Sequence, residues 1–208
     1  MKKIVFSSVL LFFFLSTSYS QEEIVTTSND HNIPRFRIGI KIGAPNIVGG
    51  NIEYLTPLFG NRIAPYIDFS TFNLDIDQAE LSFNYLEVGS IIYFNAKGKG
   101  LYTSLSYGSF NSDVLAQDAI TFEGETFTGT AEGDISIQTF NVKLGAKLGR
   151  KLYFRTEIGY GIGNIPSEVL VVGNVNGITG EGVIEIPNIP GITDTGLLLA
   201  NIGIGYSF

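Results

Sequence analysis

The strongest constraint in this sequence is a two-residue alternation of apolar and polar side chains that begins near residue 35 and recurs to residue 208. Successive side chains of a β-strand point to opposite faces, so this period predicts strands with one apolar and one polar face. Runs rich in glycine, proline, asparagine or lysine separate the alternating segments and predict turns. We expect eight strands, at 35–43, 48–56, 63–74, 81–95, 101–110, 134–148, 152–164 and 197–208.

The composition also favours extended structure over helix. The 208 residues include 25 glycines, and 12% are aromatic while only 16% are charged, which is typical of strands. The length suits one all-β domain. Beyond residue 20 no segment is long and apolar enough to cross a membrane as a helix, so a membrane-spanning form of this chain has to be a closed barrel.

The first 20 residues have the pattern of a secretory signal peptide. A basic start at Lys2 and Lys3 precedes an apolar run over 4–15, and serine occupies positions 18 and 20. We expect cleavage after Ser20, which leaves a polar leader at 21–34 and the β domain at 35–208. An uncleaved membrane anchor is the alternative, but the apolar run is too short to span a bilayer. Cysteine is absent, which excludes a lipid-modified cysteine and any disulfide.

The connections between the expected strands differ in length. Those after the second, fourth and sixth strands are short turns, whereas those after the fifth and seventh are long, at about 115–133 and 166–195. One rim of turns and one rim with longer loops is typical of barrels that cross the bacterial outer membrane. We therefore expect an all-β fold, an eight-stranded antiparallel up-and-down transmembrane β-barrel, located in the cell outer membrane.

The alternation alone leaves open which face points inward, since a soluble eight-stranded barrel would bury its apolar face around a ligand. Two features favour a polar lumen. Ten glycines lie on the polar face, which suits a narrow barrel interior. The charges on that face also nearly balance, as a closed lumen requires, because buried charge is costly unless paired; a solvated face with accidental balance is the alternative. The expected lumen charge network is Arg37, Lys41, Glu53, Asp68, Glu87, Lys143, Lys147, Arg155 and Glu157.

The last strand alternates Ile202, Ile204, Tyr206 and Phe208 and ends on an aromatic residue. Here the sequence resembles the outer-membrane β-barrel superfamily, in particular the small OmpA/OmpX-type barrels. The resemblance implies that Ile204, Tyr206 and Phe208 form the signal read by the barrel assembly machinery. The chain departs from the family pattern in having no tryptophan, so Tyr and Phe have to fill the interfacial girdles, and it lacks an appended peptidoglycan-binding domain.

Candidates for chemistry are few, and we expect no enzyme, no cofactor and no metal. Outer-membrane barrel enzymes mostly resemble one another in using a histidine base, but the single histidine, His31, lies in the polar leader. The Gly-x-Gly-x-Gly run at 159–163 has the wrong spacing for a phosphate loop. Asp75 and Asp77 supply fewer oxygens than calcium takes.

A charged lumen is expected to act as a plug, so no porin-sized conductance is predicted. The two long connections, 115–133 and 166–195, contain β-like extensions whose edges could pair with a partner's strand. We expect them to bind a surface protein or the lipopolysaccharide layer; packing on each other as a lid is the alternative. Removal of Lys2 and Lys3 leaves 11 basic and 20 acidic side chains, a net charge of −9, which disfavours nucleic acid.

The sequence thus predicts a structural or interaction barrel of the outer membrane, in contact with membrane lipid and lipopolysaccharide. Two other functions stay open. The first is a narrow outer-membrane channel for small or hydrophobic solutes. The second is a soluble periplasmic barrel that binds a ligand.

Overall fold

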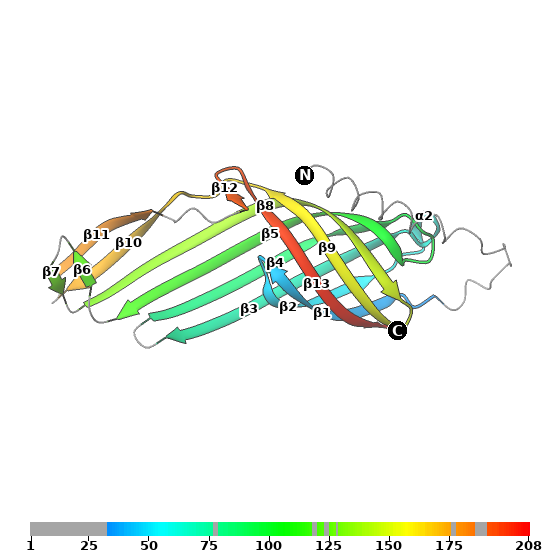
Figure 1. The fold of residues 1–208 in the computed structure, drawn as a ribbon, viewed down its shortest axis with the longest axis horizontal. Helices are drawn as coiled ribbons and strands as arrows, with labels where there is room; N and C mark the ends of the chain where they lie inside the picture. Colours follow the sequence, from blue (N-terminus) through cyan, green and yellow to red (C-terminus); the bar gives the residue numbers. More distant parts are fainter. Residues whose placement is uncertain are drawn as a thin grey trace, which may run out of the picture. The chain divides into compact units, whose positions relative to one another are not determined.

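Eight strands pair in sequence order and close on themselves (Figure 1). They are β1 (Phe36–Ala44), β2 (Ile47–Tyr54), β3 (Ile63–Ile76), β4 (Ala79–Tyr93), β5 (Gly100–Gln117), β8 (Gly129–Gly149), β9 (Leu152–Ile162) and β13 (Gly196–Ser207). Closure occurs where β1 pairs antiparallel with β13, from Arg37 opposite Ser207 to Ala44 opposite Ala200. All eight predicted strands are present. The predicted all-β antiparallel barrel, and the architecture that the resemblance to small outer-membrane barrels implies, are confirmed.

The computed structural model describes residues 33–76, 79–117, 120–122, 125–127, 129–175, 178–185 and 191–208. The expected signal peptide, its cleavage site, most of the polar leader and His31 lie outside these residues. Residues Pro34–Phe208 form one unit. Among the described residues, no helix combines the length and apolar character needed to cross a bilayer.

Five further short strands and one helical turn complete the described elements. The hairpin β10 (Glu168–Val175) and β11 (Ile178–Glu185) lies between β9 and β13, and β12 (Ile192–Thr193) pairs with the start of β13. A small hairpin, β6 (Ile120–Phe122) and β7 (Glu125–Phe127), lies between β5 and β8. The turn after β2 contains α2 (Leu58–Asn61). The turn after β8 has only two residues, Arg150 and Lys151.

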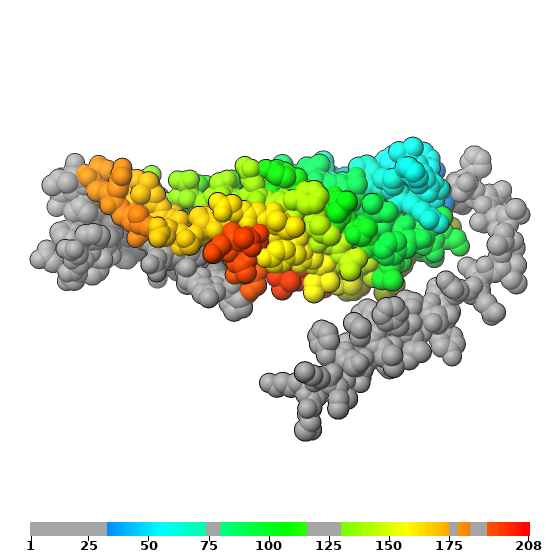
Figure 2. Space-filling view, turned by 90° about the horizontal axis from the view of Figure 1, so that it is seen from above, coloured from blue at the N-terminus to red at the C-terminus, as the bar shows by residue number. Residues whose placement is uncertain are grey.

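The barrel strands are unequal in length. β3, β4, β5 and β8 have 14, 15, 18 and 21 residues, whereas β1, β2, β9 and β13 have 9, 8, 11 and 12. The four long strands continue past the closed barrel as an open sheet, and β10 joins its edge with Val171 opposite Gly133. We call this part, residues 71–76, 79–84, 110–117 and 129–138 with β10 and β11, the extension. The β10–β11 hairpin, orange in Figure 2, lies at the far end of the extension. The turn after β2, cyan in the same view, lies at the opposite end of the barrel.

The extension corrects the predicted boundaries of the two long loops. Residues 115–117 belong to β5 and 129–133 to β8, so the first loop is shorter than 115–133. The hairpin β10–β11 occupies much of 166–195. Apolar alternation fades after residue 110, where the sequence predicts the end of this strand. Backbone pairing of β5 to β8 nevertheless continues to Gln117 opposite Thr130.

The closed barrel has apolar side chains outside and polar ones inside. Ile38, Ile158 and Ile204 are 41%, 60% and 52% exposed on the outer surface. The inward positions are buried and include the charged residues of the predicted network. This arrangement is the reverse of a soluble ligand-binding barrel, whose interior is lined by apolar side chains.

In the extension the two faces exchange character. The register between β5 and β8 runs unbroken from Gly100 opposite Lys147 to Gln117 opposite Thr130. The face that points into the lumen in the barrel therefore continues on the same side of the sheet in the extension. That face now carries apolar side chains: Phe72, Leu81, Phe83, Phe110, Val114, Ile135, Ile137, Val169 and Val171. The outer face becomes polar, with exposed Asn73, Glu80, Asn84, Asn111, Asp113, Thr130, Glu132, Asp134 and Ser136.

A row of polar contacts on the outer surface marks the exchange. Thr71 donates a hydrogen bond to Asn84 across β3 and β4 at 2.8 Å, and Ser136 donates to Asn111 across β8 and β5 at 2.8 Å. Below this row the outer face is apolar, for example at Phe140. The row therefore follows the upper edge of the apolar band around these four strands.

Candidate functional site

The nine residues of the predicted lumen charge network all lie inside the barrel. Strand alternation turns each of them inward, and none is more than 3% exposed. They come from six strands, β1, β2, β3, β4, β8 and β9. They form a turn-side cluster around Glu53 and a loop-side cluster around Glu87 and Glu157, connected through Asn51 and Arg155.

The turn-side cluster gathers three cations on one carboxylate. Glu53 accepts a hydrogen bond from Arg37 at 2.5 Å and another from Lys147. Arg155 approaches the same carboxylate at 3.4 Å. The Tyr93 hydroxyl donates to it at 2.7 Å. All the charged groups are therefore paired, but the cluster carries more positive than negative charge.

The loop-side cluster has the opposite balance. Lys41 pairs with Asp68 and, at 2.7 Å, with Glu157. Lys143 lies 2.6 Å from Glu87. Three hydroxyl groups also donate to Glu87; they belong to Tyr66, Tyr85 and Ser106. Such charge-assisted bonds offset the desolvation of buried carboxylates.

Asn51 and Arg155 connect the clusters into one network across the lumen. Arg155 donates to the Asn51 carbonyl oxygen at 2.7 Å, while the Asn51 amide donates to Asp68. The Tyr102 hydroxyl donates to Glu157 at 2.8 Å. The interior of an eight-stranded barrel is just wide enough for its own side chains, and this buried network, which we call the plug, occupies it.

Inward glycines make room for the tyrosine rings of the plug. A Cβ atom added at Gly145 would come within 2.4 Å of the Tyr102 ring, and one at Gly205 within 2.3 Å of the Tyr153 hydroxyl. The glycines thus serve close packing, as the polar-face pattern predicts. The sequence analysis left the tyrosines out of the network, although their inward alternation was visible and could have identified them.

The other sequence candidates bring little chemistry together. Gly159 and Gly161 face the lumen, where Lys143 and Asn141 lie against them, so the 159–163 run is a packing feature. Asp75 lies in β3, and Asp77 is outside the described residues. Among the described residues, no group of three or more His, Cys, Asp or Glu side chains could hold a metal ion.

The expected assembly signal lies on the outside of β13. Ile204, Tyr206 and Phe208 are all exposed, and the Phe208 ring contacts Tyr206 and Phe36 with centroids 4.9 and 6.2 Å apart. The backbone of Phe208 also pairs with Phe36. Recognition of this edge by the assembly machinery stays a prediction.

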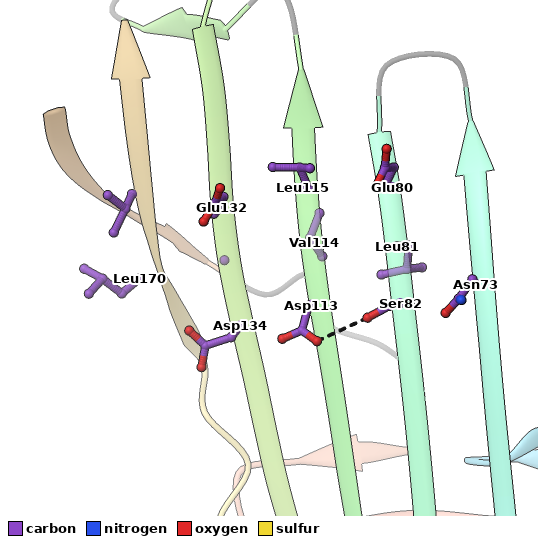
Figure 3. Close-up of a pocket in the computed structure, with 12 residues that line it drawn as sticks. Asn73, Glu80, Leu81, Ser82, Asp113, Val114, Leu115, Glu132, Asp134 and Leu170 are labelled. Carbon is purple, nitrogen blue, oxygen red and sulfur yellow. Dashed lines mark hydrogen bonds between the residues drawn. The ribbon is translucent and has the colours of Figure 1, made fainter. Parts of the chain in front are cut away.

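A second candidate site lies in the extension, in a broad hollow of about 930 Å³ (Figure 3). Four carboxylates from three strands line it: Glu80, Asp113, Glu132 and Asp134. Ser82 donates a hydrogen bond to Asp113 at 3.1 Å, and Leu115, Leu170 and Val172 add apolar surface. The sequence predicts β-like extensions near part of this hollow, but the juxtaposition of the strands appears only in the fold.

No protein-family model matches the chain, and no curated protein matches it. Solved structures similar to this chain at low identity include the following three. CarO from Acinetobacter baumannii has 10% identity, covering 87% of this chain and 100% of that one, with a TM-score of 0.49. CarO2 from the same organism has 10% identity, with 85% and 100% covered and a TM-score of 0.45. A major outer membrane protein from Thermus thermophilus has 12% identity, with 83% and 99% covered and a TM-score of 0.47. Similarity at this level assigns no ligand, partner or activity to this chain.

Proposed function

We propose that this chain is an outer-membrane protein. Its charged plug blocks the lumen of the barrel, and its extension is an interaction surface beyond the bilayer. The observation that carries the proposal is the exchange of face polarity along β3, β4, β5 and β8. An apolar outer face fits hydrocarbon, and a polar outer face above it fits water.

The apolar outer band supports insertion in a bilayer. Soluble monomers rarely expose contiguous apolar patches larger than a few hundred Å², yet every barrel strand here presents large apolar side chains outward. The soluble ligand-binding alternative requires an apolar interior, and this lumen is charged. A wide channel is disfavoured because the plug crosses the lumen; large, stable openings in a planar bilayer recording would contradict it.

The charge of the extension indicates the kind of partner. Residues 63–96, 100–142 and 156–208 contain no lysine or arginine, so nothing there attracts anionic lipopolysaccharide or nucleic acid directly. Strand β11 is an edge strand among the described elements. Its own Val183 is exposed, as are Leu170 and Val172 of the neighbouring β10. A basic protein segment in extended conformation, added as a strand next to β11, fits this surface best.

Membrane topology can be tested with single cysteines, since the natural chain has none. A membrane-impermeant maleimide on intact cells should label Glu132→Cys in the extension. Lys151→Cys, at the two-residue turn after β8, should react only after the outer membrane is permeabilised. Equal labelling of both variants, with the protein in the soluble periplasmic fraction, would reject membrane insertion.

The interaction surface can be tested separately by replacing 168–190 with a short Gly-Ser linker. We expect an intact barrel, shown by heat-modifiable migration on gels, and loss of binding to a lysine-rich extended peptide. A matched acidic peptide should not bind either protein. Unchanged binding of the basic peptide by the shortened chain would reject the hairpin as the docking element while leaving membrane insertion untouched.

A further inference from the structure

The turn after β2 has an apolar tip on the turn-side rim of the barrel. Phe59 is 79% exposed, more than any other large apolar side chain of the described residues, and Leu58 is 57% exposed. Turns that face water are usually built from small or polar residues. The turns after β4 and β8 follow that rule, with Asn-Ala-Lys-Gly-Lys at 95–99 and Arg-Lys at 150–151. The turn after β2 is therefore the apolar exception on this rim.

The backbone of this turn holds Phe59 outward. The Thr56 N–H donates to the Ile63 carbonyl oxygen at 2.9 Å and closes the turn. Phe59 and Asn61 both have positive φ, at +51° and +61°, which is uncommon for residues other than glycine and costs free energy. Asn61 is buried at 8% exposure, whereas Phe59 stays outside the packing of the barrel. The turn thus presents an exposed aromatic ring in a defined conformation.

The tip continues the apolar outer band of the barrel. Tyr54, at the turn-side end of β2, is exposed on the outer surface, as are Ile92 and Phe94 at the turn-side end of β4. Phe59 is three residues beyond the paired Thr56, so it lies within about 10 Å of the end of the strand. The headgroup region on each side of a bilayer is about 5–8 Å thick. If the band lies in hydrocarbon, the turn ends at the depth of the headgroups.

The charge of the rim suits the same surroundings. Exposed cations lie at Arg62 in this turn and at Lys99, Arg150 and Lys151 in the turns after β4 and β8. The exposed carboxylates of the described residues all lie elsewhere, at Glu80, Asp113, Glu132, Asp134, Glu168, Glu181 and Asp194. Aromatic residues and cations at one level are typical of the interface between a membrane and water, where cations meet anionic lipid headgroups.

We propose that the turn after β2 is a lipid anchor, in which Leu58 and Phe59 enter the headgroup region of the leaflet on the turn side. The inference rests on the proposed membrane insertion and adds a lipid contact beyond the barrel wall. In the purified protein, a tip reserved for a protein partner would stay in water. The two kinds of occupant can therefore be told apart.

The chain has no tryptophan, so single tryptophans can report the depth of chosen positions. The refolded chain without its expected signal peptide is inserted in phosphatidylcholine vesicles whose acyl chains carry bromine, which quenches nearby tryptophan. Three variants are compared: Phe59→Trp at the tip, Leu144→Trp in the apolar band and Glu132→Trp in the extension as the reference in water. We expect Phe59→Trp to show blue-shifted emission and quenching, strongest when bromine lies close to the headgroup.

The three variants separate the anchor from membrane insertion itself. Emission of Phe59→Trp that matches Glu132→Trp, while Leu144→Trp is quenched, would place the tip in water and overturn the anchor; membrane insertion would stand. If Leu144→Trp also behaves like Glu132→Trp, the chain is not inserted, and both proposals are wrong.

A pair of double variants measures what the anchor contributes. Leu58→Ser with Phe59→Ser removes the apolar tip, whereas Leu170→Ser with Val183→Ser removes two exposed apolar side chains of the extension. The unfolding equilibrium constant in vesicles should rise about tenfold in the first pair, as expected for losing the partial burial of two apolar side chains. It should stay unchanged in the second. No rise in the first pair, or an equal rise in both, would show that lipid does not bury the tip and would overturn the proposal.

Discussion

The extension continues four of the eight barrel strands, β3, β4, β5 and β8, in unbroken register, but the faces of the two parts carry opposite residues. In the barrel, Arg155 and its partners face inward while Ile158 faces outward. In the extension, Phe83 is buried on the lumen side while Glu132 is exposed outside. The pairing of β5 with β8 is unbroken through both parts, so under the proposed membrane insertion the medium around each part decides which residues its outer face carries.

The two parts also differ in whether their strands leave an unpaired edge. Each barrel strand has a neighbour on both sides, and buried ion pairs connect the strands across the lumen. The extension is open, with β11 as an edge strand among the described elements. Stability should therefore depend on the lumen contacts, whereas substitutions in the extension should affect partners more than folding.

The largest expected difference between the two parts concerns their carboxylates. Glu53→Gln leaves Arg37 and Lys147 buried without their carboxylate partner, and should cost about 3–5 kcal/mol. Glu132→Gln, at an exposed position of the extension, should change stability by less than about 0.5 kcal/mol. Urea unfolding in micelles, followed by gel migration, measures both. Similar costs for the two variants would contradict the division into a plugged barrel and a solvated sheet.

Single arginine substitutions along the outer face of β8 can locate the boundary between the barrel and the extension. Leu144→Arg, in the apolar band, should destabilise the inserted protein by about 2–4 kcal/mol. Phe140→Arg should cost less, and Ser136→Arg, at the polar row, close to nothing. The quantity measured is the free energy of unfolding in lipid vesicles. A cost that does not fall from Leu144 to Ser136 would place the boundary elsewhere.

The smallest expected difference in stability between the two parts concerns their glycines. Gly145→Ala puts a methyl group against the Tyr102 ring in the lumen, and should cost about 1–3 kcal/mol because the ring has to move. Gly180→Ala in β11 is the matched control, since nothing lies within 4 Å of its added methyl. The same unfolding assay applies. A neutral Gly145→Ala would mean that the lumen is packed less tightly than described.

Much of the barrel could be predicted from alternation alone. Outward Ile38 and inward Lys41 follow from a period of two, and the pairing of opposite charges follows from the cost of burying them. Which charged residues pair with one another could not be predicted from the alternation. That Glu53 meets Lys147 from a strand far along the chain depends on barrel closure and stagger, which single-strand patterns do not encode.

The extension was only partly predicted, for a related reason. Val169 and Ile184 could be assigned to a hairpin because apolar residues cluster there. The continuation of β5 through Asp113 was missed because its outer face turns polar.

The long sequence separations in the plug have a consequence for how such a chain enters a bilayer. Lys147 and Arg155 lie 94 and 102 residues beyond Glu53. A partly assembled sheet containing β1 to β5 would present Glu87 before its lysine partner, Lys143 of β8, had arrived. Ionised groups without counter-ions are costly in hydrocarbon, so hairpin-by-hairpin threading is disfavoured. For the proposed membrane insertion, closure of the barrel together with insertion is therefore favoured over stepwise entry.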